Sequence, residues 1–470
     1  MTTPTSTATH TAEHTFALPI QRTPLDQLRA RLDGAVYEPS DHEYGALVTP
    51  WNLSVTMQPA AVVQARTSQD VVQAVRFAGA HGLATGVQAT GHGAVSSLAG
   101  HLLVSTKGLD EITVHPRERW ARVGAGMKWS HLVPHVARHG LAGVSGSITD
   151  VGIVGYTTGG GVGPMARSHG INVDRVRAIE VVTGDGEFRR VTPESYPDLF
   201  FALRGGKGAA GIVTAMEIDL VELRTFYGGA SFFAADDMPA VISAWQDWSA
   251  ELPFAGTTSI GVFQMPALPG VPEPLAGRMT LSVRFVWTGR PEDGERWFSR
   301  IRSVASPVLD SVGVHTYPEI DLVHTDPLDP VPAHEHSTLL SSFDGRAADV
   351  LLEQAGPDAG SPQVLVELRQ LGGAYAFEGD HPSAFAHRSA AYSLLAVGIA
   401  GMPGVVEHGE RLVDALHPWD TGRVWPNFAP PHDAASARRA YDPATLAELS
   451  EVTRKYDPHG VLQAGAYTRA

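Results

Sequence analysis

Two glycine-rich segments in the first half of the chain are its clearest candidates for binding chemistry. The first is residues 88–94 (Gln-Ala-Thr-Gly-His-Gly-Ala), and the second is residues 146–163, which contain seven glycines. Glycine lets successive backbone N–H groups approach an anion closely, so such loops can hold phosphate. Each loop follows a short apolar run, and together they favour a cofactor that contains a diphosphate. For either loop alone, the alternative is that its glycines serve only to form tight turns.

His92 lies between two glycines, at the tip of the first loop. A ring nitrogen in that position can approach an electrophilic ring methyl without obstruction from neighbouring side chains. The residue therefore favours a covalently tethered cofactor. The alternative is a loop histidine that is packed for shape.

A nicotinamide site of the Rossmann type is a further alternative for the second loop. Residues 161–166 (Gly-Val-Gly-Pro-Met-Ala) fit the pattern G-x-G-x-x-A. However, Pro164 interrupts the turn, glycines break the preceding strand, and no βαβ unit brackets the motif. The pattern alone is weak support for this site.

The segments that must position these loops are predicted to form two kinds of structure: short strands with helices or turns, and an antiparallel sheet. Apolar spacing predicts a strand and then a helix capped by Ser68 within residues 60–82, and a hairpin turns at Asp185-Gly186. Residues 279–287 and 361–373 alternate between apolar and polar, as expected for an antiparallel sheet with one open face. Residues 443–456 predict a capped helix.

Composition excludes several classes of function. The 470-residue chain has a net charge of −15, which disfavours nucleic acid as a partner. It has no cysteine, so disulfides, thiolate metal sites and cysteine nucleophiles are ruled out. It has no long apolar run, and its polar start does not resemble a secretory signal, so we expect no membrane span and a cytoplasmic location. The 21 histidines do not converge from several elements, and we expect no metal site.

Five motifs occur in the same order as in one known family of flavoproteins. They are Gly91-His92-Gly93, residues 145–163, residues 181–187 (VVTGDGE), residues 197–220 and residues 455–462 (KYDPHGVL). With them, the chain resembles the vanillyl-alcohol-oxidase/p-cresol-methylhydroxylase flavoproteins, and in particular their berberine-bridge-enzyme-like branch. The resemblance extends from about residue 55 to the C-terminus.

The resemblance implies an α+β fold in which FAD lies between two α+β subdomains. A substrate domain with a large antiparallel sheet, flanked by helices, covers the flavin ring. The implied division is a disordered tail (1–15), an FAD-binding domain (16–222), a substrate-binding domain (223–425) and a segment that returns to the FAD domain (426–470).

The resemblance also implies the residues that hold the cofactor. His92 matches the histidine joined to the 8α-methyl group of FAD. Relatives with a second flavin link use a cysteine, where this chain has Ile148, so a single covalent link is expected. The other implied FAD-binding residues are Gln88, Ala89, Thr90, Gly91, Gly93, Ala94, Gly146, Ser147, Val151, Gly152, Gly155, Tyr156, Ile212, Val213 and Asn427.

Oxidation of an alcohol or amine by a flavin also needs a base for the O–H or N–H proton. Glu367 is the first candidate, because it shares one strand face with Arg369 and lies in a stretch that resembles the substrate-facing strand of relatives. A plain Glu367–Arg369 surface pair is the alternative. Tyr317 and Tyr375 are further catalytic candidates, with buried aromatic packing as their alternative role.

These observations predict an FAD-dependent oxidase. The expected substrate is a small molecule, such as a secondary metabolite, oxidised at a C–H bond next to oxygen or nitrogen, with O2 as electron acceptor and H2O2 as product. The alternatives are a dehydrogenase with another electron acceptor, and a non-redox cyclase or small-molecule-binding flavoprotein. A monomer or a homodimer is expected.

Overall fold

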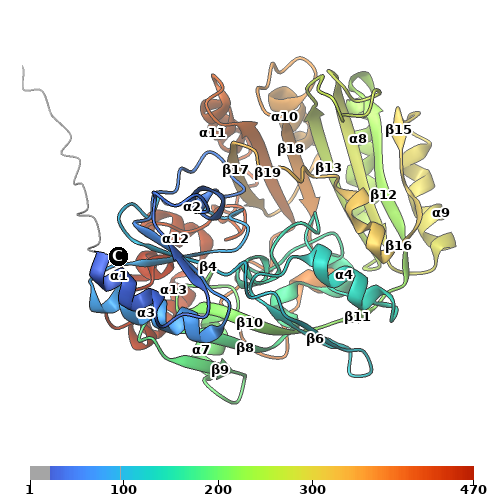
Figure 1. The fold of residues 1–470 in the computed structure, drawn as a ribbon. Coiled ribbons are helices and arrows are strands. Elements are labelled where there is room, and N and C mark those ends of the chain that lie inside the picture. Colours follow the sequence, from blue (N-terminus) through green and yellow to red (C-terminus); the bar gives the residue numbers. More distant parts are fainter. Residues whose placement is uncertain (1–21, 96, 470) are drawn as a thin grey trace, which may run out of the picture.

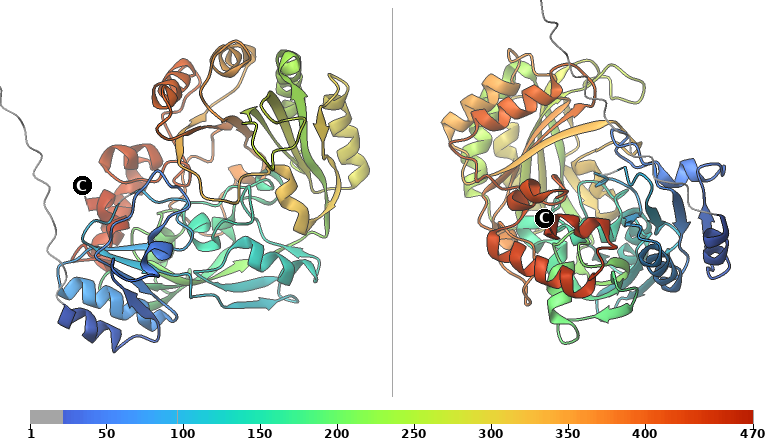
Figure 2. Two further views of the ribbon diagram at one scale, coloured as in Figure 1. Left: turned by 45° about the horizontal axis from the view of Figure 1, so that its top comes forward. Right: turned by 90° about the vertical axis from the view of Figure 1, so that its left-hand side faces the viewer.

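The computed structural model describes residues 22–95 and 97–469, and the predicted tail of residues 1–15 lies outside them. The described chain is α+β, as predicted, with a four-stranded, a five-stranded and a two-stranded sheet in one part and a large antiparallel sheet in the other (Figure 1). Views from two further directions show the same arrangement (Figure 2). No helix in the described part of the chain combines the length and the apolar character needed to cross a membrane.

The first sheet leads directly into the first glycine loop. Its order is β1 (Ala35–Tyr37), β2 (Ala61–Gln64), β4 (Leu102–Ser105) and β3 (Thr85–Gln88), and all but β1 run parallel. Helix α3 (Ser68–Ala80) covers the sheet with a buried apolar face. Its cap is Thr67, one residue before the predicted Ser68, because Thr67 and Asp70 bond each other's backbone N–H groups in a capping box.

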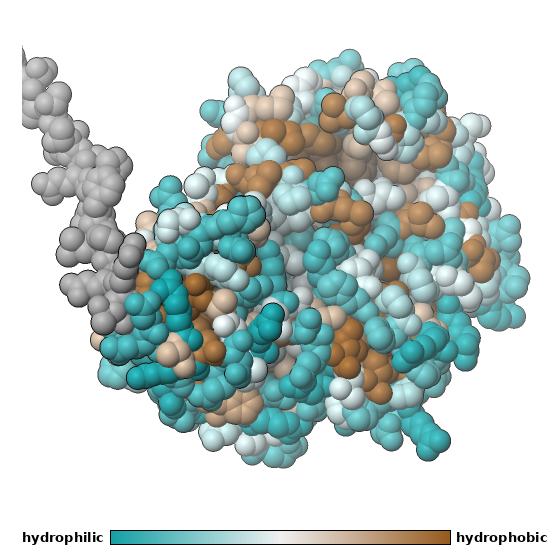
Figure 3. All heavy atoms as spheres, viewed as in Figure 1, coloured by the Kyte–Doolittle hydropathy of each residue, from teal (hydrophilic) through white to brown (hydrophobic). Residues whose placement is uncertain are grey.

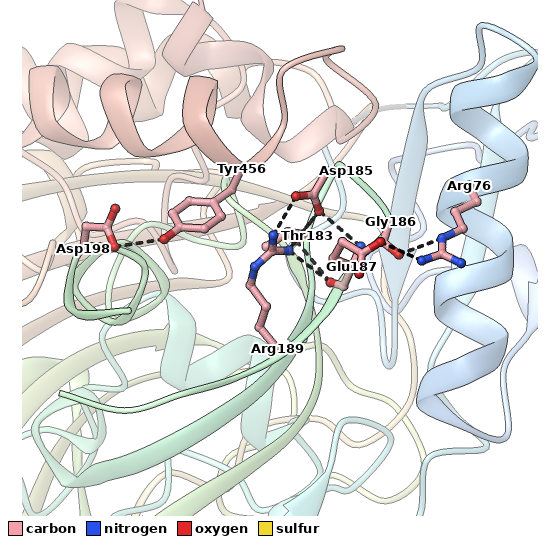
Figure 4. A network of polar contacts seen from close by, with 8 residues as sticks. All are labelled: Arg76, Thr183, Asp185, Gly186, Glu187, Arg189, Asp198 and Tyr456. Atoms are coloured by element: carbon pink, nitrogen blue, oxygen red, sulfur yellow. Dashed lines mark hydrogen bonds and ion pairs between the residues drawn. The ribbon is translucent and has the colours of Figure 1, made fainter. Parts of the chain in front are cut away.

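The second sheet contains the predicted hairpin. Its order is β5 (Ile112–His115), β6 (Trp120–Gly124), β10 (Ile212–Asp219), β8 (Val176–Val182) and β9 (Phe188–Val191). Asp185 at the turn pairs with Arg189 at 2.7 Å, and Arg76 of α3 donates to the carbonyl of Gly186 at 3.0 Å (Figure 4). The turn is thereby fixed to the helix of the first sheet.

The large sheet follows the two smaller ones in the chain. Its order is β15 (Leu309–Asp310), β12 (Thr225–Ala234), β14 (Met279–Trp287), β13 (Gly256–Gln264), β18 (Leu365–Gln370), β19 (Tyr392–Ile399) and β17 (Ala333–Leu340), and β16 (Gly313–Thr316) also pairs with β12. One face carries apolar residues such as Val366, Leu368 and Leu394, which pack against helices. Because side chains alternate between faces, the neighbouring residues Leu365, Glu367 and Leu395 point to the opposite face.

Four helices cover the outer face of this sheet: α8 (Met238–Glu251), α9 (Pro291–Arg302), α10 (Gly345–Ala355) and α11 (Val405–Ala415) (Figure 1). The fully buried Trp245 and Trp248 of α8 anchor this layer, and Trp245 Nε1 donates to Thr258 Oγ1 at 3.0 Å. Truncating one such tryptophan to alanine costs about 3–5 kcal/mol. The inner face is left free to line a cavity.

The last residues return to the first part of the chain. Helices α12 (Ala434–Ala440), α13 (Pro443–Tyr456) and α14 (Ala466–Arg469) belong to the same hydrophobic core as the two smaller sheets (Figure 2). Thr85 at the start of β3 donates its N–H to the Val461 carbonyl at 2.7 Å. Tyr456, at the end of α13, donates to Asp198 at 3.0 Å (Figure 4).

Shorter elements connect these layers. They are α1 (Arg22–Arg29), α2 (Tyr44–Val48), α4 (Trp129–Ala137), α5 (Ile153–Thr158), α6 (Ala166–His169), α7 (Pro197–Leu203), β7 (Leu141–Ala142), β11 (Val221–Glu222), and the 3-10 turns η1 (Asn172–Arg175), η2 (Ala235–Asp237), η3 (Tyr317–Val323), η4 (Gly373–Ala376) and η5 (Gln463–Gly465). Helix α5 starts inside the second glycine segment and carries Tyr156.

Candidate active site

A cavity of about 1630 Å³ lies between the inner face of the large sheet and the two glycine loops. Pockets for drug-sized ligands measure about 300–1,000 Å³, so this one has room for a large ligand and a second molecule. Figure 3 shows apolar side chains gathered around a hollow in the upper part of the molecule. The apolar part of the cavity wall includes Phe232, Phe263, Leu365, Leu395 and Val397.

The first glycine loop presents backbone donors to this cavity. Residues 89–93 all line it, and none of their N–H groups donates to another described residue. Gly91 has φ +81°, and a Cβ there would stand 2.6 Å from Pro50 Cα. The loop conformation therefore requires glycine, and it offers a row of unpaired donors to an anion.

His92 is positioned by two contacts. Its ring stacks on Trp51 with centroids 4.5 Å apart, and its Nδ1 lies 2.8 Å from Thr90 Oγ1. Nε2 makes no hydrogen bond with any residue that the structure describes. Burial lowers the pKa of His92 to about 4, so at neutral pH the imidazole is uncharged and able to act as a nucleophile.

The second glycine segment forms the opposite side of the cradle. Gly146, Ser147 and Ile148 line the cavity, and their N–H groups also donate to no described residue. Gly146 approaches the Tyr156 ring so closely that a Cβ would lie 3.0 Å from Cε2. The Tyr156 hydroxyl is buried at the cavity wall without a partner in the described chain, and burial raises the pKa of this phenol well above its usual value.

Asn427 and Lys207 join this segment to the end of the chain. Lys207 Nζ donates to Asn427 Oδ1 at 2.5 Å and to the Gly155 carbonyl at 3.1 Å, and Asn427 Nδ2 donates to the Tyr156 carbonyl at 2.9 Å. Burial lowers the pKa of Lys207 to about 8. Sequence reasoning missed Lys207. The sequence feature that could have indicated Lys207 is its position in the glycine-rich run Gly205-Gly206-Lys207-Gly208. In the structure Lys207 adopts φ +52°.

Glu367 lies in the cavity wall but is enclosed by cations. It pairs with Arg284, with Arg369 Nε at 2.7 Å, and accepts a hydrogen bond from Ser259 Oγ at 3.2 Å. Burial alone would raise the pKa of Glu367, but Arg369 and Arg284 outweigh it and hold this pKa well below the usual range. A carboxylate in that state is a poor proton acceptor. Nor is it the plain surface pair that was the alternative, because Glu367 is fully buried.

His324 lies beside the same carboxylate. Its Nε2 is 3.4 Å from Glu367 Oε1, yet the two atoms do not have hydrogen-bond geometry. Burial lowers the pKa of His324 to about 4, so this ring is neutral and adds no charge. Arg284, Arg369 and Glu367, called the Glu367 group below, therefore carry one net positive charge.

The structure does not place the other two catalytic candidates in the cavity. The hydroxyl of Tyr317 donates to the Gly143 carbonyl at 2.9 Å, and that of Tyr375 to the His387 carbonyl at 3.0 Å. Neither residue is part of the cavity wall. Their positions do not support the catalytic role, which stays a prediction, because both hydroxyls donate to backbone carbonyls in the packed interior.

Most residues predicted to bind the cofactor do line the cavity: Gln88, Ala89, Thr90, Gly91, His92, Gly93, Ala94, Gly146, Ser147, Val151, Gly152, Gly155, Tyr156, Val213 and Asn427. Ile212 does not, because it points into the core from the other face of β10. The side chain of Gln88 lines the wall, but its amide donates to the Leu47 carbonyl at 3.2 Å and so holds the end of α2.

Glu335 is a second cavity carboxylate that sequence reasoning missed. It lies on β17, between His334 and His336, and its side chain lines the cavity whereas those of the two histidines do not. It has no hydrogen-bond or ion-pair partner in the described chain. Partial desolvation, followed by repulsion from Asp326, raises the pKa of Glu335 to about 7.

Comparison with known proteins identifies the group that the glycine cradle accommodates. Residues 59–192, which include both glycine-rich segments, match the family described as "FAD binding domain". The chain carries an FAD-binding domain. This match agrees with the resemblance to vanillyl-alcohol-oxidase/p-cresol-methylhydroxylase flavoproteins on which the prediction of FAD rested.

Similar sequences agree with this assignment. (R)-6-hydroxynicotine oxidase of Paenarthrobacter nicotinovorans is 27% identical over 294 residues, which are 62% of this chain and 62% of that protein. A Fusarium proliferatum protein named FAD-dependent monooxygenase FUP4 is 33% identical over 191 residues, which are 40% of this chain and 37% of that protein. The match thus spans between about a third and two thirds of these relatives' lengths.

Solved structures share the fold along nearly the whole chain. The crystal structure of 6-hydroxy-D-nicotine oxidase from Arthrobacter nicotinovorans superimposes with a TM-score of 0.81 at 23% identity, covering 92% of this chain and 97% of that one. The Physcomitrella patens BBE-like 1 protein gives a TM-score of 0.81 at 19% identity, with 94% and 98% covered. These neighbours confirm the fold class of the FAD-binding domain and of the sheet that covers it.

The residues present fit FAD. The unpaired N–H groups of residues 89–93 and 146–148 are the donors that a diphosphate needs. A Cβ on Gly155 would meet no atom within 4 Å, so the wall leaves open space beside α5. A neutral His92 with a free Nε2 is compatible with attachment to the flavin, which stays a prediction.

Proposed function

We propose that this chain is an FAD-dependent oxidase of small, mostly apolar molecules, with the flavin attached through His92 by a single covalent link. The observation that carries the proposal is the pairing, in one cavity, of a row of unpaired backbone donors with an apolar wall on the large sheet. The relatives named above as oxidases and a monooxygenase support it.

When bound, FAD supplies a two-electron acceptor: it takes a hydride from a C–H bond next to O or N, and O2 then removes the two electrons with two protons, so that an alcohol or amine and O2 give a carbonyl compound or imine and H2O2. The protein's own residues bind and orient the cofactor and the substrate. The amides of residues 89–93 and 146–148 hold the diphosphate, and the apolar wall packs the body of the substrate and excludes water.

The Glu367 group contributes a fixed positive charge rather than a base. Arg369 remains slightly exposed to the cavity, and its guanidinium lies over the Phe428 ring at 5.1 Å. Its position is determined by Glu367, which in turn holds Arg284 in place. Negative charge in this part of the cavity is thereby stabilised.

The attachment is tested on the purified, denatured protein. A fluorescent flavin band on a denaturing gel in wild type, lost in His92→Ala, supports the tether. Flavin released from denatured wild type would contradict the covalent link and keep FAD as a dissociable cofactor. A wild-type protein that never carries flavin would contradict the whole proposal.

The reaction is tested with alcohols and amines as candidate substrates. Bleaching of the flavin without oxygen, followed by peroxide formation in air, is the result expected of an oxidase. Bleaching without peroxide in air would indicate a dehydrogenase with another acceptor. A flavin that no candidate bleaches would favour a non-redox role.

A further inference from the structure

The charged side chains that line the cavity come from separate elements. Lys207 lies at the glycine-loop end, and the positively charged Glu367 group lies in the middle of the sheet. Glu335 lies on the edge strand β17, and Asp326 and Asp329 lie in the connection that precedes that strand. This connection is bonded to residues just before the first glycine loop, because Trp51 Nε1 donates to the Leu328 carbonyl at 3.3 Å and the Ala333 N–H donates to Asn52 Oδ1 at 3.1 Å. The acidic side chains thus lie along one edge of the sheet, apart from the guanidinium groups at its middle.

Glu335 differs from Glu367 in having no cation to balance it. Glu367 has two guanidinium partners, whereas the carboxylate of Glu335 makes no ion pair or hydrogen bond in the described chain. In the sheet, Glu335 and Glu367 are two strands apart and offset by two residues along the strand direction. At standard strand spacing this separation is roughly 12 Å. Arg369 and Arg284 are therefore not positioned to neutralise Glu335.

The register also shows what lies beside Glu335. Across the sheet it is opposite Val397 of β19, which is opposite Leu365 of β18, which is opposite Phe263 of β13. All four residues line the cavity, so one apolar row leads from the carboxylate across the wall. The three apolar residues span about 10 Å at standard strand spacing. A ligand that fills this row has a compact apolar body and a basic group at one end.

Glu335 lines the cavity, and much of the residue is exposed rather than packed against other residues. A ligand in the cavity can therefore reach its carboxylate. Partial desolvation, with repulsion from Asp326, raises its pKa to about 7. A cation bound beside the carboxylate favours its ionised form.

We propose that Glu335 binds the protonated nitrogen of the substrate, so that this enzyme acts on small apolar amines rather than on sugars or other polyols. The inference deepens the proposed function and rests on it for the reaction, whereas the binding of a cation beside Glu335 is independent of any turnover. Glu335 acts here as a specificity-determining residue that contacts the substrate: its carboxylate pairs with the ammonium group and accepts its proton, so that the neutral amine is the form that is oxidised.

The first test measures binding without chemistry. Benzyltrimethylammonium, a fixed cation, is titrated into the flavin-loaded protein, with benzyl alcohol as the neutral comparison, and the change in flavin absorption gives each Kd. We expect Glu335→Gln to weaken binding of the cation about tenfold or more and to change binding of the alcohol less than twofold. Glu353→Gln, an exposed site on α10, removes the same charge outside the cavity and should change neither Kd.

The second readout is the pH dependence of the cation's Kd. Other titratable or charged groups at the cavity or beside Glu335 are His92, Tyr156, Lys207, Asp326, Asp329, Glu367, Arg369, His432, Tyr467, His334 and His336. In wild type, affinity for the cation should rise as pH rises through about 7, because the carboxylate then forms. This dependence should disappear in Glu335→Gln and persist in Glu335→Asp. An unchanged Kd and pH profile in folded Glu335→Gln would overturn the inference.

The third readout separates the inference from the proposed function. The flavin is mixed anaerobically with α-methylbenzylamine and with α-methylbenzyl alcohol, which share one skeleton. Bleaching by the amine alone, and at a lower rate in Glu335→Gln, supports both the oxidase function and the role of Glu335. Bleaching by the alcohol alone, with no effect of Glu335→Gln, keeps the oxidase and overturns the inference. Absence of bleaching by a wider panel of both classes, with cation binding still dependent on Glu335, contradicts the oxidase and supports the binding site.

Discussion

Replacing Glu367 by glutamine separates a structural role from a catalytic one. The carboxylate is fully buried, and the guanidinium of Arg284 beside it is only 1% exposed. Removing the negative charge leaves Arg284 buried without a counter-ion, a change that costs about 3–5 kcal/mol. For a domain the size of the predicted substrate-binding domain, a loss of about 1 kcal/mol lowers Tm by roughly 2–4 °C. We therefore expect Glu367→Gln to melt roughly 6–20 °C below wild type.

The measurement is a urea or thermal unfolding curve followed by circular dichroism on the flavin-loaded protein. Glu353→Gln serves as the matched control and should change stability by less than about 0.5 kcal/mol. A double variant, Arg284→Met with Glu367→Met, should recover much of the loss, because the buried pair is then replaced by apolar groups of similar volume.

The pH dependence has a defined sign. The folded-state pKa of Glu367 lies well below its unfolded value, so its stabilisation is complete above the ordinary carboxyl pKa and is lost as pH falls through the folded pKa. The stability difference between wild type and Glu367→Gln should be constant above about pH 5 and shrink in stronger acid.

The rate of flavin reduction in Glu367→Gln can refute the structural role of Glu367. At a temperature where the variant is fully folded, we expect reduction within about tenfold of the wild-type rate, since no proton transfer is lost. A Glu367→Gln protein that keeps wild-type stability but reduces its flavin about 10²-fold more slowly would refute the structural role and make Glu367 the base.

Three further substitutions test other parts of the structure. Gly91→Ala introduces a Cβ that would lie 2.6 Å from Pro50 Cα at a positive φ, so we expect loss of flavin incorporation, read from the visible absorption of the purified protein. Tyr317→Phe removes a buried hydrogen bond outside the cavity and should lower stability by about 1–2 kcal/mol while flavin reduction stays within about twofold; a large loss of rate at equal stability would return this phenol to the mechanism. Thr67→Ala breaks the capping box with Asp70 and should cost about 1 kcal/mol in a urea melt, and no change would show that the cap contributes nothing.

Local signals predicted the elements better than they predicted the partners of buried side chains. The hairpin around Asp185-Gly186 and helix α13 follow from turn residues and apolar spacing, which act over a few positions. The cap of α3 is displaced by one residue, since Thr67 and Ser68 have similar capping chemistry and only the bond to Asp70 distinguishes them.

The surroundings of Glu367 could not be read from its own strand. Arg284, which neutralises it, is 83 positions away on β14, and the two strands are separated in the sheet by β13. Sequence spacing revealed the shared face with Arg369 but gave no access to this long-range register. The same limit explains Tyr317, whose partner carbonyl at Gly143 is 174 positions away.

Glu335 shows how strand phase decides which residue faces a site. In sequence, residues 334–336 are most conspicuous for their two histidines, beside a proline-rich connection. In the structure they lie on β17, where alternation sends Glu335 one way and both histidines the other. Only the pairing of β17 with β19 establishes this phase.

The return of the chain end to the first sheet imposes an order on biosynthesis. The hydrogen bond between Thr85 and Val461, and the cavity walls at Gln463, Ala464 and Tyr467, depend on residues translated after the whole eight-stranded sheet. A nascent chain still short of residue 461 has both glycine loops but lacks this part of their enclosure. We therefore expect FAD loading to require residues 461–467, and ribosome-bound chains stalled before residue 461 should acquire FAD poorly even when their large sheet has folded.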